Sequence, residues 1–580
     1  MNQHLKVKSL LSRISATLVL FALAVSASVS MHVTASVSAS VSPVLGGKIV
    51  VGVSNTFNGY CLKQLDINSS MSGVRSIAET LFERDSKGKL QGLLLKSAIP
   101  EPGNKFWNLE VRTKTDGSPI QFHDGSAWNA DALIANFNAL RGLTYVAKLN
   151  TVGAENLLGT TTGVLLANIV STVKNSESNV RVELFSPQAD VSDLLYASGH
   201  MIMRSPGMLA DTATCTDTLI GTGPFVLESS ALNKLVVTRN QNYWRTDSAG
   251  RSLPYLKQIT FQNVSEPATR LSRVKSGRLD AAHFDSFTDS RYMKSLSSSN
   301  DLSYLKSSQD YYPSLWFNTS IAPFNNVNAR KAVSLAIDRK TWARDQGSGV
   351  NAPAKSIVGI RNIMYSKNSY PVFSLVKARE FADAYRGETG VPLEFTFPAP
   401  SGSGWKSISK AFVAMMKKAG ITASFTQKAA NEIINGGIFA IETGFQYQAA
   451  FLTKFEGREA QFNNAFLLST MVEPQTTNPM AGLIRLAKIE ATLNITKHQD
   501  IELDALVRTA RFSGIAVDFQ KISERVQDMA YITNITDQSF ALAASKKLSG
   551  LGKAKLSGGK YEAAVSSWGT NWSTVWKSKK

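Results

Sequence analysis

Residues 322–342 read "APFNNVNARKAVSLAIDRKTW", and this stretch is the most informative one in the chain. A Pro-Phe pair and two asparagines precede a run of apolar residues at helical spacing, which is typical of a helix start followed by one buried face. The apolar positions are Ala329, Ala332, Val333, Ala336 and Ile337. The stretch therefore predicts an amphipathic helix, placed directly after the strand-like "SLWFNTS" at 314–320.

Two other segments predict strand–helix–strand units. In the first, "QITFQNV" (258–264) precedes a short helix bearing Leu271 and Val274, and a second strand starts at Leu279. In the second, "LEFTFPAP" (393–400) and "ITASFTQ" (421–427) flank a helix with one apolar face. Tight strand–helix–strand connections imply parallel strand pairing. Because the two units lie far apart in the chain, they suggest two α/β lobes instead of one continuous sheet.

A third segment, from 122 to 142, predicts a turn and then a helix. Asn129 is a suitable N-cap, and Leu133, Phe137 and Leu140 share a helix face with Ile134. His123 and Asp124 stand in "FHDG", where turn formation is a better explanation than catalysis.

The first 43 residues resemble a targeting segment. Basic residues precede the apolar run "ATLVLFALAV" (16–25), which is too short to span a bilayer and is followed by small residues. We interpret 1–43 as a signal peptide with a Ser/Val/Ala-rich leader, although an uncleaved anchor remains an alternative. No cysteine follows the apolar run, so a lipid-anchored N-terminus is not expected. The expected location is periplasmic or otherwise extracytoplasmic.

The composition and the motif content of the chain bear on which classes of function are expected. The chain has 580 residues and a formal net charge of +19, but its basic residues are dispersed, which favours a solvated basic surface over a nucleic-acid site. The two cysteines, Cys61 and Cys215, could pair in an exported protein or remain two buried thiols. We find no G-x-S-x-G or H-E-x-x-H motif and no metal-ligand spacing among the six histidines. We therefore predict no catalytic residue, no metal site and no cofactor.

Several motifs together resemble a known family. They are "FHDGSAWNADALIANFNAL" (122–140), "GTGPFVL" (221–227), "RNQNYW" (239–244), "YLKQITFQNVSEPATRLSRVKSGRLDAA" (255–282) and "FNTSIAPFNNVNARKAVSLAIDRKTW" (317–342). In this order and spacing, the chain from about 48 to 545 resembles the family 5, peptide/nickel-binding type of extracytoplasmic solute-binding protein of ABC importers.

The resemblance implies an α/β, two-lobed periplasmic-binding-protein fold of type II, a clamshell with an extra subdomain on the first lobe. By that analogy, 48–310 with 540–580 form the first lobe, 86–206 the inserted subdomain and 319–535 the second lobe. "SLWFNTS" then becomes a segment that crosses between the lobes. Arg330, Asp338 and Arg339 match the family pattern, and we expect them to form surface or interlobe ion pairs.

The resemblance also implies the function. Such a protein captures a peptide or peptide-like solute between its lobes and delivers it to ABC permease subunits in the membrane, acting as a monomer without binding nucleic acid. Two alternatives remain open: a non-peptide solute such as a sugar, an opine or a nickel chelate, and a sensory or scaffolding role without import.

Aromatic and amide side chains near strand ends are the candidate ligand contacts, because aromatic faces bury area and amides pair with peptide groups. They are Phe57, Asn58, Tyr60, Tyr311, Trp316, Asn318, Trp405, Gln446 and Tyr447. A core or hinge role is the alternative for each.

One departure bears on the ligand. Peptide binders of this family usually carry an Asp-Tyr-x-Asp stretch that can pair with the free amine of a peptide. The nearest counterpart here is "AIETGFQYQAAF" (440–451), where Glu442 is the only acid. A neutral amide does not replace a charged partner for ammonium, so a free-amine peptide is in doubt.

Overall fold

The structure of the protein, a computed structural model, describes residues 42–57, 59–61, 71–141, 165–210, 215–307, 311–367, 370–433, 447–454, 460, 464, 466–469 and 494–578. Met1–Ser42 and Pro43–Lys580 are separate units, and everything below concerns the second unit. Within the described residues, no helix combines the length and apolar character needed to cross a membrane. The predicted signal peptide lies outside the described residues.

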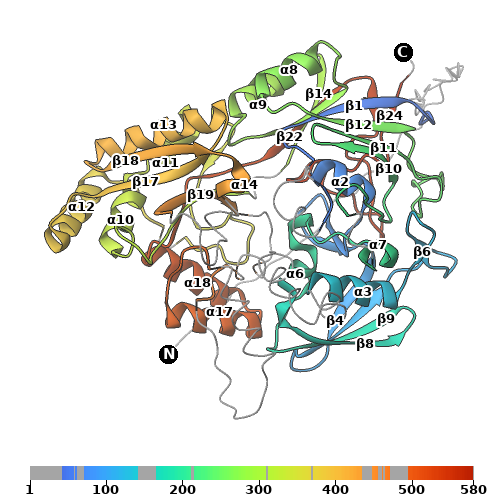
Figure 1. The fold of residues 1–580 in the computed structure, drawn as a ribbon, viewed down its shortest axis with the longest axis horizontal. Helices are drawn as coiled ribbons and strands as arrows, with labels where there is room; N and C mark the ends of the chain where they lie inside the picture. Colours follow the sequence, from blue (N-terminus) through green and yellow to red (C-terminus); the bar gives the residue numbers. More distant parts are fainter. Residues whose placement is uncertain are drawn as a thin grey trace, which may run out of the picture. The chain divides into compact units, whose positions relative to one another are not determined.

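A seven-stranded mixed sheet forms the centre of the first lobe (Figure 1). Its order is β10 (Phe225–Ala231), β11 (Lys234–Arg239), β12 (Gln258–Asn263), β1 (Lys48–Val53), β13 (Ala281–Asp285), β22 (Phe540–Ser545) and β14 (Leu302–Lys306). β1 runs parallel to both β12 and β13, whereas β22 is antiparallel to β13 and β14. A strand from near the C-terminus therefore completes a sheet that starts at residue 48.

The predicted unit at 258–285 forms, but its strands do not pair directly. β12 leads through α8 (Pro267–Lys275) to β13, and β1 lies between the two strands. The predicted parallel direction is confirmed, because β12 and β13 both run parallel to β1. The two strands do not pair with each other, because the crossover helix spans one intervening strand and β1 occupies that position. α8 and α9 (Ser290–Ser297) pack on this sheet through a cluster that includes Val274, Phe284 and Met293.

The opposite face of the sheet packs on α2 and on the C-terminal segment, including Trp568 and Trp572. The remaining elements of this lobe are α2 (Met71–Ile77), β2 (Phe82–Arg84), β3 (Leu90–Gly92), α7 (Pro206–Ala210), β23 (Leu548–Ser549) and β24 (Trp576–Lys577). Cys61 and Cys215 form a disulfide within this lobe, with Cα atoms 4.8 Å apart, so the first of the two cysteine alternatives holds.

A separate antiparallel sheet follows β3 in the chain, with strand order β4 (Leu95–Pro100), β5 (Phe106–Val111), β9 (Asn179–Leu184) and β8 (Ile169–Ser176). The predicted helix is confirmed as α3 (Ala130–Leu140), and Asn129 caps it by accepting a hydrogen bond from the Ala132 N–H at 3.0 Å. Leu133, Phe137 and Leu140 are buried, because this apolar face packs into the core. Short elements here are β6 (Ile120–Gln121), β7 (Ala127–Trp128), η1 (Leu166–Asn168), α6 (Ser192–Tyr196) and η2 (Ala197–Gly199).

The second lobe contains the other predicted unit. β17 (Glu394–Pro400), α13 (Ser403–Lys418) and β18 (Thr422–Lys428) form a strand–helix–strand in which the two strands pair in parallel, as predicted. Beside it, β15 (Tyr312–Phe317) lies between β19 (Ala449–Lys454) and β20 (Ile532–Asn534). The other elements are α11 (Arg339–Asp345), β16 (Ala352–Pro353), α12 (Leu375–Thr389), α14 (Ala430–Ile433), α17 (Ile501–Ser513), α18 (Ala516–Asp528) and β21 (Thr536–Asp537).

The helix predicted from 322–342 is confirmed as α10 (Val327–Ala336), and Asn326 caps it by accepting from the Asn328 N–H at 2.7 Å. All five of its predicted apolar positions are buried. Phe324 anchors the turn before α10, because its ring packs against Phe317 and Phe395 with centroids 4.5 and 4.9 Å apart.

The prediction of ion pairs for Arg330 and Arg339 was wrong. Both side chains are buried and donate hydrogen bonds within the second lobe, Arg330 to the Phe324 carbonyl at 2.7 Å and Arg339 to the Asn534 carbonyl at 2.8 Å. Asp338 instead caps α11 by accepting from the Thr341 N–H at 3.0 Å. Guanidinium groups supply several donors, so a buried arginine can hold turns and strand ends together.

Two chain segments connect the lobes and lie side by side. The Gln538 N–H donates to the Tyr311 carbonyl, and the Ser307 N–H donates to the Phe540 carbonyl, both at 2.8 Å. One segment leads into β15 and the other leads from β21 into β22. The residue boundaries of the lobes that the resemblance implies stay predictions.

Candidate functional site: a cavity between the lobes

A cavity of about 550 Å³ lies where the lobes meet. Its first-lobe wall comes from the ends of β1 and β13 and from the start of α8, and its second-lobe wall is 401–405, at the start of α13. Tyr311 and Gln538 of the connecting segments also line it. The carboxyl ends of neighbouring parallel strands meet at one edge of a sheet, which is where α/β folds place ligands.

The start of α13 closes this cavity against the first lobe. Ser403 Oγ donates to Glu266 Oε2 at 2.9 Å, and the ring of Trp405 meets Phe287 edge-on with centroids 5.2 Å apart. Gly404 is also close, since a Cβ atom at this position would lie 3.0 Å from Thr288 Cβ. These contacts join segments more than 100 residues apart in the chain.

Carboxylates dominate the charged groups of the first-lobe wall. Asp285 Oδ1 accepts from the N–H groups of Phe287 and Thr288 at 2.9 and 3.0 Å, which fixes the turn after β13. Arg270 and Asp289 form a buried ion pair. Burial, followed by the Asp285 carboxylate, raises the pKa of Asp289, and Arg270 opposes this effect.

His283 also lines the cavity and stacks on Phe540 with ring centroids 5.6 Å apart. Its Nε2 lies 3.1 Å from the Ser566 carbonyl, which requires a proton on this nitrogen. Burial lowers the pKa of His283 to about 4, so the ring is neutral at pH 7.

Of the residues that the sequence singled out, Trp405 and Tyr311 line the cavity. Five others are buried and are not among the residues that line it: Phe57, Tyr60, Trp316, Asn318 and Tyr447. Asn58 and Gln446 lie outside the described residues.

The buried candidates have structural contacts. Tyr60 OH donates to Ser230 Oγ at 2.6 Å, and Asn318 Nδ2 donates to the Tyr447 carbonyl at 2.9 Å. Trp316 packs edge-on against Phe466 with ring centroids 6.2 Å apart. These placements favour the core and hinge alternatives, and a ligand-binding role for these residues stays a prediction.

Sequence reasoning missed several residues of the cavity wall, namely Glu266, His283, Asp285, Gln538 and 401–404. Asp285 ends a strand in "AAHFD", so the strand-end argument applied to Phe57 also applies to it. No local signal identifies Gln538 or Gly404, because they reach the cavity only through long-range packing.

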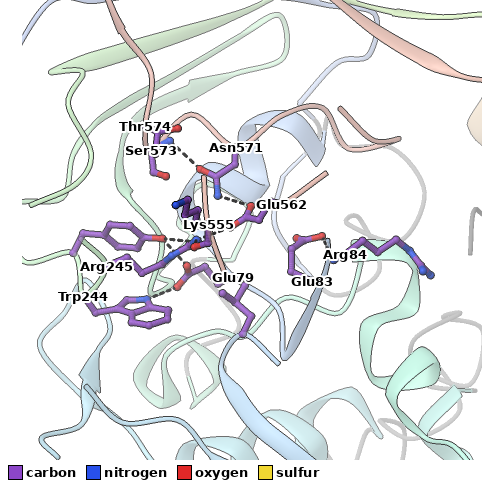
Figure 2. Close-up of polar contacts among 12 residues, drawn as sticks. Glu79, Glu83, Arg84, Trp244, Arg245, Lys555, Glu562, Asn571, Ser573 and Thr574 are labelled. Atoms are coloured by element: carbon purple, nitrogen blue, oxygen red, sulfur yellow. Dashed lines mark hydrogen bonds and ion pairs between the residues drawn. The ribbon is translucent and has the colours of Figure 1, made fainter. Parts of the chain in front are cut away.

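A second polar cluster lies in the first lobe, near the C-terminal segment (Figure 2). Glu79 accepts from Tyr243 OH at 2.8 Å, Trp244 Nε1 at 2.8 Å and Thr222 Oγ1 at 2.9 Å. Arg245 pairs with Glu562 at 2.6 Å. These contacts anchor the segment around Glu562 to the lobe.

The chain is similar in sequence to known families and proteins. Residues 118–455 match the family model "Bacterial extracellular solute-binding proteins, family 5 Middle". The glutathione-binding protein GsiB of Escherichia coli (strain K12) is 24% identical over 354 residues, covering 60% of this chain and 62% of that relative. The match thus spans less than two thirds of the relative's length.

Solved structures share the fold. AgaA of A. tumefaciens R10, in complex with agropinic acid, has a TM-score of 0.72 and 17% identity, and the match covers 92% of this chain and 99% of AgaA. The oligopeptide-binding protein AppA of Bacillus subtilis, in complex with a nonapeptide, has a TM-score of 0.71 and 16% identity, with coverage of 93% and 100%.

Two α/β lobes with a cavity between them define a two-lobed binding protein of the clamshell type. The chain belongs to family 5 of the bacterial extracellular solute-binding proteins, since the family model matches more than half of it. The fold class implied by the resemblance is therefore confirmed.

Proposed function

We propose that this protein is the extracytoplasmic solute-binding component of an ABC importer, which captures a peptide or peptide-like solute in the cavity between its lobes and delivers it to a membrane permease. The observation that carries the proposal is the cavity of about 550 Å³, whose wall combines both lobes and both connecting segments. Cavities of roughly 300–1,000 Å³ suit small organic ligands.

The arrangement suits binding without chemistry. A solute that touches both walls has more contacts when the lobes are closed, so its binding energy shifts the protein towards the closed state. A permease can distinguish that state from the open one. Trp405 is the residue that we expect to contact the solute from the second lobe, because it lines the cavity beside Phe287.

The relatives support a peptide-like solute. GsiB is named for glutathione, and AppA was solved with a nonapeptide. We further propose that residues 1–43 direct export, that the mature protein acts as a monomer and that it catalyses no reaction.

Native mass spectrometry of the freshly purified full-length mature protein tests the proposal. We expect a co-purified small solute, or binding of a di- or tripeptide with a Kd near 1 μM, about −8 kcal/mol. Absence of an adduct, together with no thermal shift across peptide, sugar and amino-acid-derivative panels, would contradict solute binding. Turnover of an added compound would contradict the non-enzymatic role.

A further inference from the structure

The charge of the cavity wall is opposite to that of the protein. The chain carries 63 Lys and Arg residues against 44 Asp and Glu, yet among the described residues that line the cavity the acids are Glu266, Asp285 and Asp289, and the only Lys or Arg is Arg270. In a chain with an excess of basic residues, an acidic wall around one cavity is a local feature.

The one arginine in the wall is already occupied. Arg270 is 1% exposed, pairs with Asp289, and donates from Nη1 to the carbonyls of Val264 and Ser265 at 2.7 Å each. It therefore neutralises one of the three carboxylates. Glu266 and Asp285 have no arginine or lysine partner among the described residues, and their hydrogen bonds come from Ser403, Thr288 and backbone N–H groups.

A second, independent observation concerns Gln538. This residue lines the same cavity from the connecting segment and is 2% exposed, and its side-chain Oε1 receives no hydrogen bond from any residue that the structure describes. Buried amide oxygens almost always have a donor. The amide oxygen of this cavity residue is thus a buried acceptor without a donor among the described residues.

Aromatic rings complete this part of the wall. Phe287, Tyr311, Trp405 and Phe540 line the cavity, with Tyr311 edge-on to Phe540 at 4.7 Å. Aromatic faces attract cations as well as apolar groups. Carboxylates, an unpartnered amide oxygen and aromatic faces all favour a ligand group that is positively charged and donates hydrogen bonds.

We propose that the solute carries a cationic donor group, an ammonium or a guanidinium, and that Glu266 and Asp285 of the first lobe receive it beside the aromatic rings of the cavity. This inference rests on the proposed function and specifies the ligand of the same site. It locates the acidic receptor on the first lobe, at the ends of β12 and β13, and not in the segment around Gln446 where the sequence led us to look for it.

Four probes distinguish binding of an ammonium from binding of a guanidinium. They are Ala-Arg, N-acetyl-Ala-Arg, Ala-Ala and N-acetyl-Ala-Ala. Each is titrated calorimetrically into the full-length mature protein and into the variants Glu266→Gln and Asp285→Asn. Glu266→Gln retains an acceptor for Ser403, and Asp285→Asn retains an acceptor for the turn. Asp301→Asn, an exposed residue that does not line the cavity, is the control with the same charge change.

We expect at least one cationic probe to bind tenfold or more tightly than N-acetyl-Ala-Ala. Each cavity variant should reduce that preference to less than about threefold, and Asp301→Asn should preserve it. The inference would be overturned by preferential binding of N-acetyl-Ala-Ala, the probe without a cationic group, or by a cationic preference that neither cavity variant alters.

Native mass spectrometry covers the case in which no probe binds. A co-purified solute with an amine or guanidine that is lost from the Glu266→Gln/Asp285→Asn double variant supports the inference. A co-purified solute with neither an amine nor a guanidine contradicts the inference but leaves the proposed function intact. Absence of any adduct and of any probe binding counts against both.

Discussion

Single residues in this protein show how burial changes the role of a polar group. Arg330 and Arg339 match a family pattern that we interpreted as surface ion pairs, yet they are buried and donate to backbone carbonyls. Asp537, in contrast, has a buried carboxyl oxygen, Oδ1, that lacks a hydrogen-bond partner among the described residues. Burial raises the pKa of Asp537 to about 7.

The raised pKa of Asp537 predicts a pH-dependent stability effect. The folded state holds the proton up to about pH 7, whereas the unfolded chain releases it near pH 3.8, so the favourable contribution of the protonated group is complete below pH 3.8 and lost as pH rises through 7. An asparagine at this position would not titrate. We therefore expect Asp537→Asn to raise the free energy of unfolding by about 2–4 kcal/mol at pH 8 relative to its effect at pH 4.

Urea unfolding of the wild type and Asp537→Asn at pH 4 and pH 8 measures this difference. Asp301→Asn, a substitution of an exposed aspartate, is the control and should show little change between the two pH values. An equal effect of Asp537→Asn at both pH values would contradict the prediction.

Among the elements, α13 has two roles. Its apolar face, including Ile408, Phe412 and Met416, is buried in the second lobe, while its first turn closes the cavity against the first lobe. The helix therefore carries the closing contact on a rigid support. Gly404 permits that contact, because a Cβ atom there would lie 3.0 Å from Thr288 Cβ and 3.2 Å from the Thr288 carbonyl oxygen.

Gly404→Leu should hold the lobes apart. The leucine side chain would occupy the space of Thr288, so the closed state should lose population and solute affinity should fall tenfold or more. Leucine has a higher helix propensity than glycine, by nearly 1 kcal/mol, so the melting temperature should be unchanged or slightly raised.

Calorimetry with the co-purified solute, or with the tightest-binding probe of the four, tests this variant. Gly387→Leu provides the matched control and should leave affinity unchanged, because Gly387 lies within a helix and a Cβ atom there would meet no other atom within 4 Å. Unaltered binding by Gly404→Leu would show that closure does not require this approach.

At the scale of the whole molecule, distant parts of the chain are joined in each lobe. β22 inserts between β13 and β14, and the pair Arg245–Glu562 anchors the C-terminal segment beside the first-lobe sheet. The disulfide joins Cys61 to Cys215 across 154 positions of sequence. On the chain-entropy model, closing so long a loop restricts the unfolded chain and stabilises the fold by up to about 5 kcal/mol.

The Cys61→Ser/Cys215→Ser double variant should therefore unfold at lower urea concentration, with a loss of up to about 5 kcal/mol in the free energy of unfolding. Solute affinity should change less than threefold, because neither cysteine lines the cavity. Equal unfolding midpoints for the oxidised wild type and the double variant would contradict a stabilising disulfide.

The short-range features followed from the sequence alone. The cap at Asn129, the start and buried face of α10 and the parallel pair β17–β18 depend on residues a few positions apart or on one connecting helix, so periodicity and turn residues are sufficient to predict them. The expectation that aromatic side chains near strand ends contact the ligand also identified Trp405 and Tyr311, two residues of the cavity wall.

Tertiary structure alone decided the rest. It placed β1 between β12 and β13, buried Tyr60 and Trp316 away from the cavity, and brought Glu266, Asp285, Gln538 and Gly404 together. Local hydrogen bonding and side-chain periodicity determine which segments become helices and strands. Packing between segments hundreds of residues apart decides which strand lies at a given place in a sheet and which polar groups face a shared cavity. No local sequence pattern records this packing.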